Sequence, residues 1–255
     1  MDYRVLNLAS NTFNENNTAY WHKSVGGYHA AKLRRYQEMI EEHISDEMQG
    51  LYGAVADAGG LPDEKQGADF PVLNMLNTSY AVIPMQDGSQ APIRNPYAMG
   101  NAWFVDEVQY VSNANEEIEA IHGLNPQQTA VVDKKFESIV KSIPSDAMDT
   151  IELVAYEPNY LKYEVDSEKG GTVVFSEIYY PGWQSTIDGQ EAAHGRANYI
   201  LRAMNVPAGK HVVEFRFDPK SLHTTETIAF IATGLLALLA VVVIVMKIKA
   251  CRKVG

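Results

Sequence analysis

Apolar residues follow three different patterns along the chain, and the first is helical. Leu33, Tyr36, Ile40 and Ile44 recur at spacings of three or four residues, which predicts an amphipathic helix over 29–48. Short apolar runs around it indicate further elements. The expected set adds strands at 3–8, 80–84, 102–111 and 130–133, helices at 70–76 and 116–122, the latter capped by Asn113 or Asn115, and a loop at 49–69. We therefore expect a small mixed α/β domain over residues 1–145.

After Pro144 the pattern changes to a period of two. Leu161, Tyr163 and Val165 alternate with the charged Lys162 and Glu164, as in a strand with one buried face. The same alternation or apolar enrichment predicts strands at 151–156, 161–165, 172–180, 184–187, 199–204 and 213–217, with turns at 168–171, 188–189 and 207–209. Residues 146–220 are therefore expected to form an antiparallel β-sandwich.

The third pattern is an uninterrupted apolar run at 228–246. Its nineteen residues carry no charge, and as a helix they are long enough to cross the hydrocarbon core of a bilayer. A linker at 221–227 precedes the run. A tail at 247–255 follows it and holds four basic residues, Lys247, Lys249, Arg252 and Lys253. The predicted fold class is thus α+β with a single C-terminal transmembrane helix.

The basic tail also predicts an orientation. Lys and Arg gather on the cytoplasmic side of membrane helices, so we expect residues 247–255 inside the cell and the bulk of the chain outside. The first residues show no basic stretch followed by an apolar run that would export such a domain. We therefore expect the chain to be the C-terminal piece of a longer protein with several membrane helices. A cytosolic domain with a C-terminal tail anchor is the alternative, although it places four cations outside.

Charge and composition exclude several function classes. Before residue 228 the chain holds 17 of its 21 basic residues and all 32 acidic residues, a formal charge of −15, which argues against a nucleic-acid partner. The single cysteine, Cys251, lies in the tail, so no disulfide stabilises the outer part. Motifs of metalloproteases, serine hydrolases and nucleotide-binding loops are absent, and the seven histidines lack metal-ligand spacing. We predict no catalytic residue, no metal ligand and no cofactor in this chain.

One basic cluster stands out within the acidic outer part. It surrounds the pair Gly26-Gly27, where exposed backbone N–H groups and a helix N-terminus would favour a phosphate or another anion. The candidate anion contacts are Lys23, His29, Lys32, Arg34 and Arg35. The alternative is a solvated basic helix face that pairs with the acidic residues further along the same helix.

A second cluster combines aromatic and acidic residues at 176–190. Aromatic faces can cover the apolar C–H face of a sugar while carboxylates accept hydrogen bonds from its hydroxyls. The candidate sugar contacts are Tyr180, Trp183 and Asp188. The same residue types also suit a sandwich corner followed by an Asp-Gly hairpin, so a purely structural role is the alternative.

Several segments together resemble the YfhO family of bacterial polytopic membrane proteins. They lie at 22–44, 70–84, 100–108 and 174–219, and the last contains YYPGW, IDG, RANYILRA, VPAGKH and EFRFDP in that order. The resemblance implies the extracytoplasmic C-terminal region and last membrane helix of such a protein, at a bacterial plasma membrane. It also implies similarity to multi-helix (GT-C) glycosyltransferases that use lipid-linked sugars and decorate cell-envelope polymers such as lipoteichoic acid.

The resemblance sets the functional expectation. The family's catalytic acid lies near the start of a multi-helix core that this sequence does not contain, so catalysis is expected elsewhere in the parent protein. The chain is expected to help recognise a polyprenyl-phosphate sugar or the acceptor polymer, with the rest of the membrane core as partner. A membrane-anchored surface module that binds glycan or protein without chemistry is the alternative.

Overall fold

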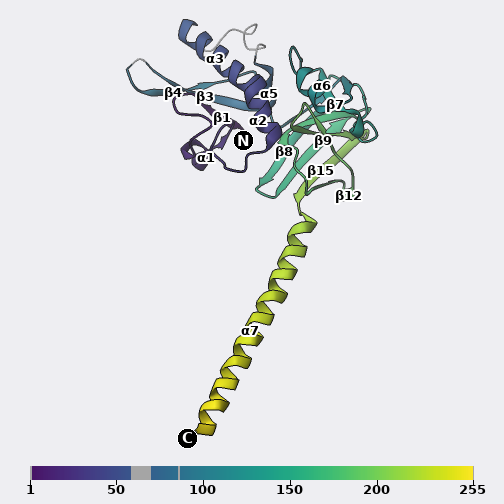
Figure 1. The fold of residues 1–255 in the computed structure, drawn as a ribbon. Coiled ribbons are helices and arrows are strands. Elements are labelled where there is room, and N and C mark those ends of the chain that lie inside the picture. The colour runs from purple at the N-terminus through teal and green to yellow at the C-terminus, as the bar shows by residue number, and fades with distance from the viewer. Residues whose placement is uncertain (1, 59–69, 86, 255) are drawn as a thin grey trace.

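The computed structural model describes residues 2–58, 70–85 and 87–254, and one long helix projects from the rest of the fold (Figure 1). We call the part before residue 220 the headpiece. Its strands are β1 Arg4–Asn7, β2 Lys23–Ser24, β3 Thr78–Pro84, β4 Gln90–Arg94, β5 Ala102–Val105, β6 Glu107–Val111, β7 Thr129–Asp133, β8 Thr150–Glu157, β9 Tyr160–Ser167, β10 Gly171–Ile178, β11 Trp183–Ile187, β12 Gln190–Glu191, β13 Gly195–Ala197, β14 Leu201–Val206 and β15 Gly209–Phe217. Its helices are α1 Asn17–Trp21, α2 Arg34–Met39, a π-helical turn Ile40–Ile44, α3 Ser45–Ala58, α5 Pro71–Met75, α6 Ala114–Glu119 and a 3₁₀ turn Lys134–Phe136.

The first sheet has the order β2-β1-β3-β4. Strand β1 runs parallel to both β2 and β3, whereas β3 and β4 are antiparallel. Met39 and Ile44 of the long helical segment share a buried core with Leu6 of β1 and Leu73 of α5. The helices therefore cover this sheet through the apolar stripe that the sequence predicts.

The second half of the headpiece is a β-sandwich, and the predicted α+β fold class is confirmed. Sheet β12-β11-β15-β9-β8 is antiparallel throughout and faces sheet β13-β14-β10-β5. Burial between them follows the period-two pattern because alternate residues of each strand point inward. The core between the sheets contains Leu161, Tyr163, Val165, Val173, Phe175, Met204, Val206, Val213 and Phe215.

Strand β5 connects the two halves of the chain. It pairs antiparallel with β10, placing Phe104 opposite Val173. The outer face of the same sheet contributes Val174 and Ala203 to the core that also holds Leu6. The domain boundary predicted near residue 145 stays a prediction, but both a sheet and a hydrophobic core extend across it.

The predicted strand at 102–111 is two strands. The backbone N–H groups of Asp106 and Glu107 both donate to the carbonyl of Gln128, at 2.8 and 3.0 Å. This contact turns the chain out of the sandwich sheet, and residues 107–111 then pair in parallel with β7. The helix that follows is capped by Asn113, whose side chain accepts from the N–H groups at positions 115 and 116, one of the two caps expected.

The helix expected at 29–48 begins at Arg34 instead of His29 and extends to Ala58. Its start is delayed because the preceding loop bonds to a distant segment: the Gly27 N–H donates to the Thr12 carbonyl at 2.7 Å. Its end is delayed because Leu51 and Val55 continue the buried stripe. Residues 49–58, expected as loop, are therefore helical, while 59–69 lie outside the described residues.

The projecting helix, α7 Lys220–Val254, includes the predicted membrane span. Residues 220–249 are the one stretch of the described chain that is long and apolar enough to cross a membrane, with a mean hydropathy of 3.0 in its most apolar window. The segment 221–227, expected as a linker, forms the first turns of this helix. The hydroxyls of Thr224 and Thr225 donate to carbonyls four residues earlier, which satisfies these polar side chains within a helix.

Candidate functional site

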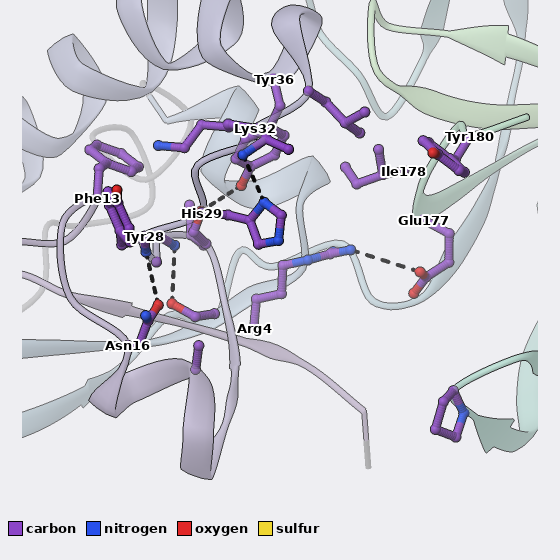
Figure 2. Close-up of a pocket in the computed structure, with 18 of the residues that line it drawn as sticks. Arg4, Phe13, Asn16, Tyr28, His29, Lys32, Tyr36, Glu177, Ile178 and Tyr180 are labelled. Carbon is purple, nitrogen blue, oxygen red and sulfur yellow. Dashed lines mark hydrogen bonds and ion pairs between the residues drawn. The ribbon is translucent and has the colours of Figure 1, made fainter.

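A pocket of about 730 Å³ lies between the loop before α2 and one edge of the sandwich (Figure 2). The N-terminal side of its wall includes Phe13, Tyr28 and Lys32, and the sandwich side includes Tyr180 and Phe217. These two groups are more than 140 positions apart in the sequence. Only the folded chain makes them neighbours.

The pocket unites members of both clusters singled out in the sequence. His29 and Lys32 of the basic cluster line it, as do Tyr180 and Trp183 of the aromatic cluster. The basic and aromatic clusters therefore contribute to one site instead of two. Their role in binding stays a prediction.

Three of the basic candidates are engaged elsewhere. Lys23 forms ion pairs with Asp2 at 2.8 Å and with Glu177 at 2.5 Å. Arg35 donates to Glu117 at 2.9 Å. Arg34 pairs with a glutamate one turn along α2, and its side chain is 91% exposed. None of the three lines the pocket, and Arg34 matches the alternative of a solvated helix face.

Asp188, the third candidate sugar contact, lies in the hairpin between β11 and β12. Its carboxylate bonds to the His211 ring at 2.6 Å and accepts from the Val212 N–H at 2.8 Å. Its backbone has φ of 51° and is followed by Gly189 with φ of 78°, the left-handed pair of a tight hairpin. Asp188 thus holds a turn in this structure and does not line the pocket.

Lys32 is the accessible cation of the pocket wall. Its Nζ lies 5.4 Å from the centroid of the Phe13 ring, and it forms no ion pair with any residue that the structure describes. His29 is exposed beside it, and its Nδ1 accepts from the Ala31 N–H at 3.1 Å. A lysine on an aromatic face without a carboxylate keeps its full charge for a ligand.

The aromatic part of the pocket is built at the end of the sandwich nearest to α7. The Phe217 ring lies 5.5 Å from the Trp183 ring and 6.0 Å from the Tyr180 ring, measured between centroids. Tyr180 is 45% exposed. These three rings offer flat apolar faces to a ligand, as expected for contact with a sugar or an isoprenoid chain.

Two buried arginines of the pocket were not anticipated from the sequence. Arg4 is 5% exposed and donates to the Leu76 carbonyl at 2.7 Å, with its Nη2 at 4.0 Å from Glu177. Arg202 is 2% exposed, and its guanidinium lies 4.0 Å from the Trp183 ring. A charge placed between the apolar residues Leu201 and Ala203 of β14 is the sequence signal that marks Arg202 as unusual.

Glu177 and Arg202 stay ionised in this buried environment. Burial alone would raise the pKa of the Glu177 carboxyl, but the charges of Arg4 and Lys23 beside it hold that pKa below its ordinary value. Burial lowers the pKa of the Arg202 guanidinium to about 10, so this side chain is still protonated at neutral pH. The pocket therefore combines fixed positive charge with aromatic surface, and within the described residues no set of three or more His, Cys, Asp or Glu side chains is arranged to hold a metal ion.

Comparison with known proteins gives one informative match. Residues 122–245 match the model of a family described as "Bacterial membrane protein YfhO". The match covers the sandwich except for β5, and most of α7. No curated protein and no solved structure gives a significant match. This match and the apolar C-terminal helix fit a fragment of a membrane protein of the YfhO family.

Proposed function

We propose that the headpiece binds the head group of a polyprenyl-phosphate sugar in the pocket, as the outer part of a glycosyltransferase-like membrane protein. The convergence of Lys32, Trp183 and Tyr180 on one pocket carries this proposal. A cation suits the phosphate, and ring faces suit the sugar and the first isoprenoid units. Catalysis itself is assigned to the membrane core of the parent protein.

The position of the pocket suits a ligand anchored in a bilayer. Phe217 lines the pocket and ends β15, and α7 starts three residues later. Gly182 holds this junction, since its carbonyl accepts from the Asp218 N–H at 3.0 Å. A lipid-linked head group reaching up from the membrane surface would meet this end of the headpiece first.

The proposal includes an orientation. The basic residues after the membrane span favour a cytoplasmic position for that end, and the headpiece then faces the cell envelope. This is the side on which envelope polymers such as lipoteichoic acid are decorated, and the acceptor polymer is the second expected partner.

Binding by the full chain in neutral-lipid nanodiscs tests the proposal. The probe is glucose linked through a phosphodiester to farnesol, and its dissociation constant is measured for wild type, Lys32→Ala, Trp183→Ala and Arg34→Ala. Loss of a cation or of a stacking ring should each weaken binding about tenfold, equivalent to about 1.4 kcal/mol. Arg34→Ala is the matched control, because it removes a charge from the same segment outside the pocket.

The outcomes separate the proposal from its alternative. Equal weakening by Arg34→Ala and Lys32→Ala would reject the pocket as the site. Binding of free glucose oligomers as tight as binding of the lipid-linked probe would favour a surface module for soluble glycans. Unchanged polymer glycosylation in cells carrying Trp183→Ala in the complete protein, at normal protein level, would reject the role in sugar transfer.

A further inference from the structure

A buried group of five charges lies partly in the pocket wall and partly behind it, and its charges do not balance. Asp2 and Glu177 supply two negative charges, while Arg4, Lys23 and Arg202 supply three positive ones. The side chains of the two carboxylates are 15% and 13% exposed, and that of Lys23 is 22% exposed. Among the described residues this group therefore carries one excess positive charge away from bulk water.

Arg202 is the member of the group without a direct partner for its charge. It forms no ion pair within the described residues, and its Nε donates only to the Ile178 carbonyl, at 3.1 Å. Its Nη1 is buried and has no hydrogen-bond partner in the described structure. A buried donor left unpaired is destabilising, more so when it is charged, so a ligand that supplies the acceptor regains that free energy.

Arg202 also belongs to the pocket wall, between aromatic faces. Its guanidinium lies over the Trp183 ring at 4.0 Å and near the Phe215 ring at 5.2 Å. The rings cover parts of the guanidinium, and among the described residues no carboxylate forms an ion pair with it. Tyr163, also buried nearby, stays neutral because burial raises its pKa well above the ordinary value.

We infer that Arg202 is the anion-binding residue of the pocket and that the buried group selects a ligand with a single negative charge. This inference rests on the proposed function and specifies it: the ligand is a phosphodiester, which carries one charge, and not a phosphate monoester or a neutral glycan. Arg202 donates to a phosphate oxygen, and Glu177 and Asp2 together keep the excess charge at one by balancing Arg4 and Lys23. Lys32, half-buried at the rim, contacts the same phosphate or the sugar from the solvent side.

The ion pair between Lys23 and Asp2 offers a balanced test, because neither residue lines the pocket. Asp2→Asn raises the excess charge to two, and Lys23→Gln lowers it to zero. Both variants break the same ion pair, so structural damage would move affinity in the same direction. The charge argument instead requires opposite directions: tighter binding for Asp2→Asn and weaker binding for Lys23→Gln, by at least about threefold each at an effective dielectric near 20.

The probes are farnesyl methyl phosphate, a phosphodiester, farnesyl phosphate, a monoester, and farnesol as the neutral reference, bound to the full chain in neutral-lipid nanodiscs. Wild type should prefer the phosphodiester, and Glu177→Gln should shift the preference toward the monoester. Arg202→Gln should reduce binding of both phosphates to the level of farnesol, with a thermal unfolding curve to confirm that it folds.

Failure of the inference and failure of the proposed function give different results. If Trp183→Ala weakens binding of the lipid-linked sugar while Asp2→Asn and Lys23→Gln shift phosphate affinity in the same direction, the anion-binding role of Arg202 is rejected and the pocket stands. If wild type binds neither phosphate better than farnesol, the inference is overturned. If it also fails to bind the lipid-linked sugar, the proposed function falls with it.

Discussion

Arg35 on α2 donates to the wholly buried carboxylate of Glu117 on α6 at 2.9 Å, across 82 positions of the sequence. Arg196 on β13 donates to the same carboxylate at 2.8 Å. The guanidinium of Arg35 also lies 4.2 Å from the Tyr199 ring. One buried carboxylate thus connects the long helical segment, α6 and the sandwich.

This relationship predicts a sharp contrast between neighbouring arginines. Glu117→Ala should lower the free energy of unfolding by about 3–5 kcal/mol, because it leaves the buried Arg196 without its main partner. Arg35→Ala should cost about 1–3 kcal/mol, since Glu117 keeps one donor. Arg34→Ala breaks only an exposed ion pair with Glu38, one helical turn away. It should lower the free energy of unfolding by no more than about 0.5 kcal/mol. Chemical denaturation in detergent measures all three, and equal losses for Arg34→Ala and Arg35→Ala would contradict the prediction.

Acid should destabilise the sandwich through His194. Its Nδ1 is 2.7 Å from the Ser185 hydroxyl, and burial, followed by the charge of Arg202, lowers its pKa to about 4. Between pH 6.5 and 4, His194 is therefore protonated in the unfolded chain but neutral in the folded chain. The free energy of unfolding falls as pH falls through this window. The loss amounts to about 3 kcal/mol for a shift of this size. Unfolding at pH 7.5 and 4.5 should show a smaller acid loss for His194→Gln than for wild type, and an identical loss would exclude His194 as the cause.

The ion pair between Asp188 and His211 should make stability depend on pH in the opposite sense. The His211 ring donates to the Asp188 carboxylate and to the Ala208 carbonyl, and these hydrogen bonds raise the pKa of His211 above its ordinary value. The stabilisation is therefore present below about pH 6.5 and is lost as pH rises through the folded pKa. Asp188→Asn keeps the left-handed backbone but removes the charge, so its melting temperature should fall below that of wild type more at pH 5.5 than at pH 8.5. A difference independent of pH would assign the effect to the turn alone.

Gly182 should tolerate no side chain. Its φ is +103°, and a Cβ would lie 2.9 Å from the Pro219 Cβ and 3.1 Å from the Phe217 ring. Gly182→Ala should therefore destabilise the fold and displace Phe217 from the pocket wall. The control is Gly189→Ala, with φ of +78° and open space around its Cβ, which isolates the backbone cost of about 1–2 kcal/mol. A Gly182→Ala protein as stable as Gly189→Ala would refute the predicted clash.

The orientation can be read from the single cysteine of this sequence. With Cys251 after the membrane span, a membrane-impermeant maleimide added to intact cells should label it only after the cells are opened. The matched control is Met148→Cys in a Cys251→Ser background, because Met148 is 81% exposed on the headpiece and should be labelled from outside. Labelling of Cys251 in intact cells would reverse the proposed topology. Any other cysteines of the parent protein are replaced first.

Elements set by local patterns were predictable from the sequence. The sandwich strands follow from alternation such as Leu161, Tyr163 and Val165, and the membrane helix follows from an apolar run with no charge. The helix start was not predictable, because a hydrogen bond from Gly27 to Thr12 holds the preceding residues in a loop. The break at Asp106 likewise depends on the distant carbonyl of Gln128.

The candidate site was predictable only in its parts. Lys32 and Trp183 were identified by residue type, but their shared pocket depends on packing between segments far apart in the chain. Sequence position also could not show that Lys32 lines the pocket while Arg35, three residues later, does not. Arg35 instead donates to the buried Glu117. Arg202 was missed because one charge in a strand reveals nothing about whether a carboxylate faces it in the fold.

The unbroken course of α7 gives the headpiece a mechanical link to the bilayer. The helix runs from Lys220 through the apolar span without interruption, and only Asp218 and Pro219 separate it from Phe217 in the pocket wall. A membrane helix longer than the local hydrocarbon thickness relieves the mismatch by tilting. Since a rigid helix transmits its tilt to its end, a thinner bilayer would shift the ring of Phe217. Under the proposed function, lipid composition would then control ligand access to the pocket.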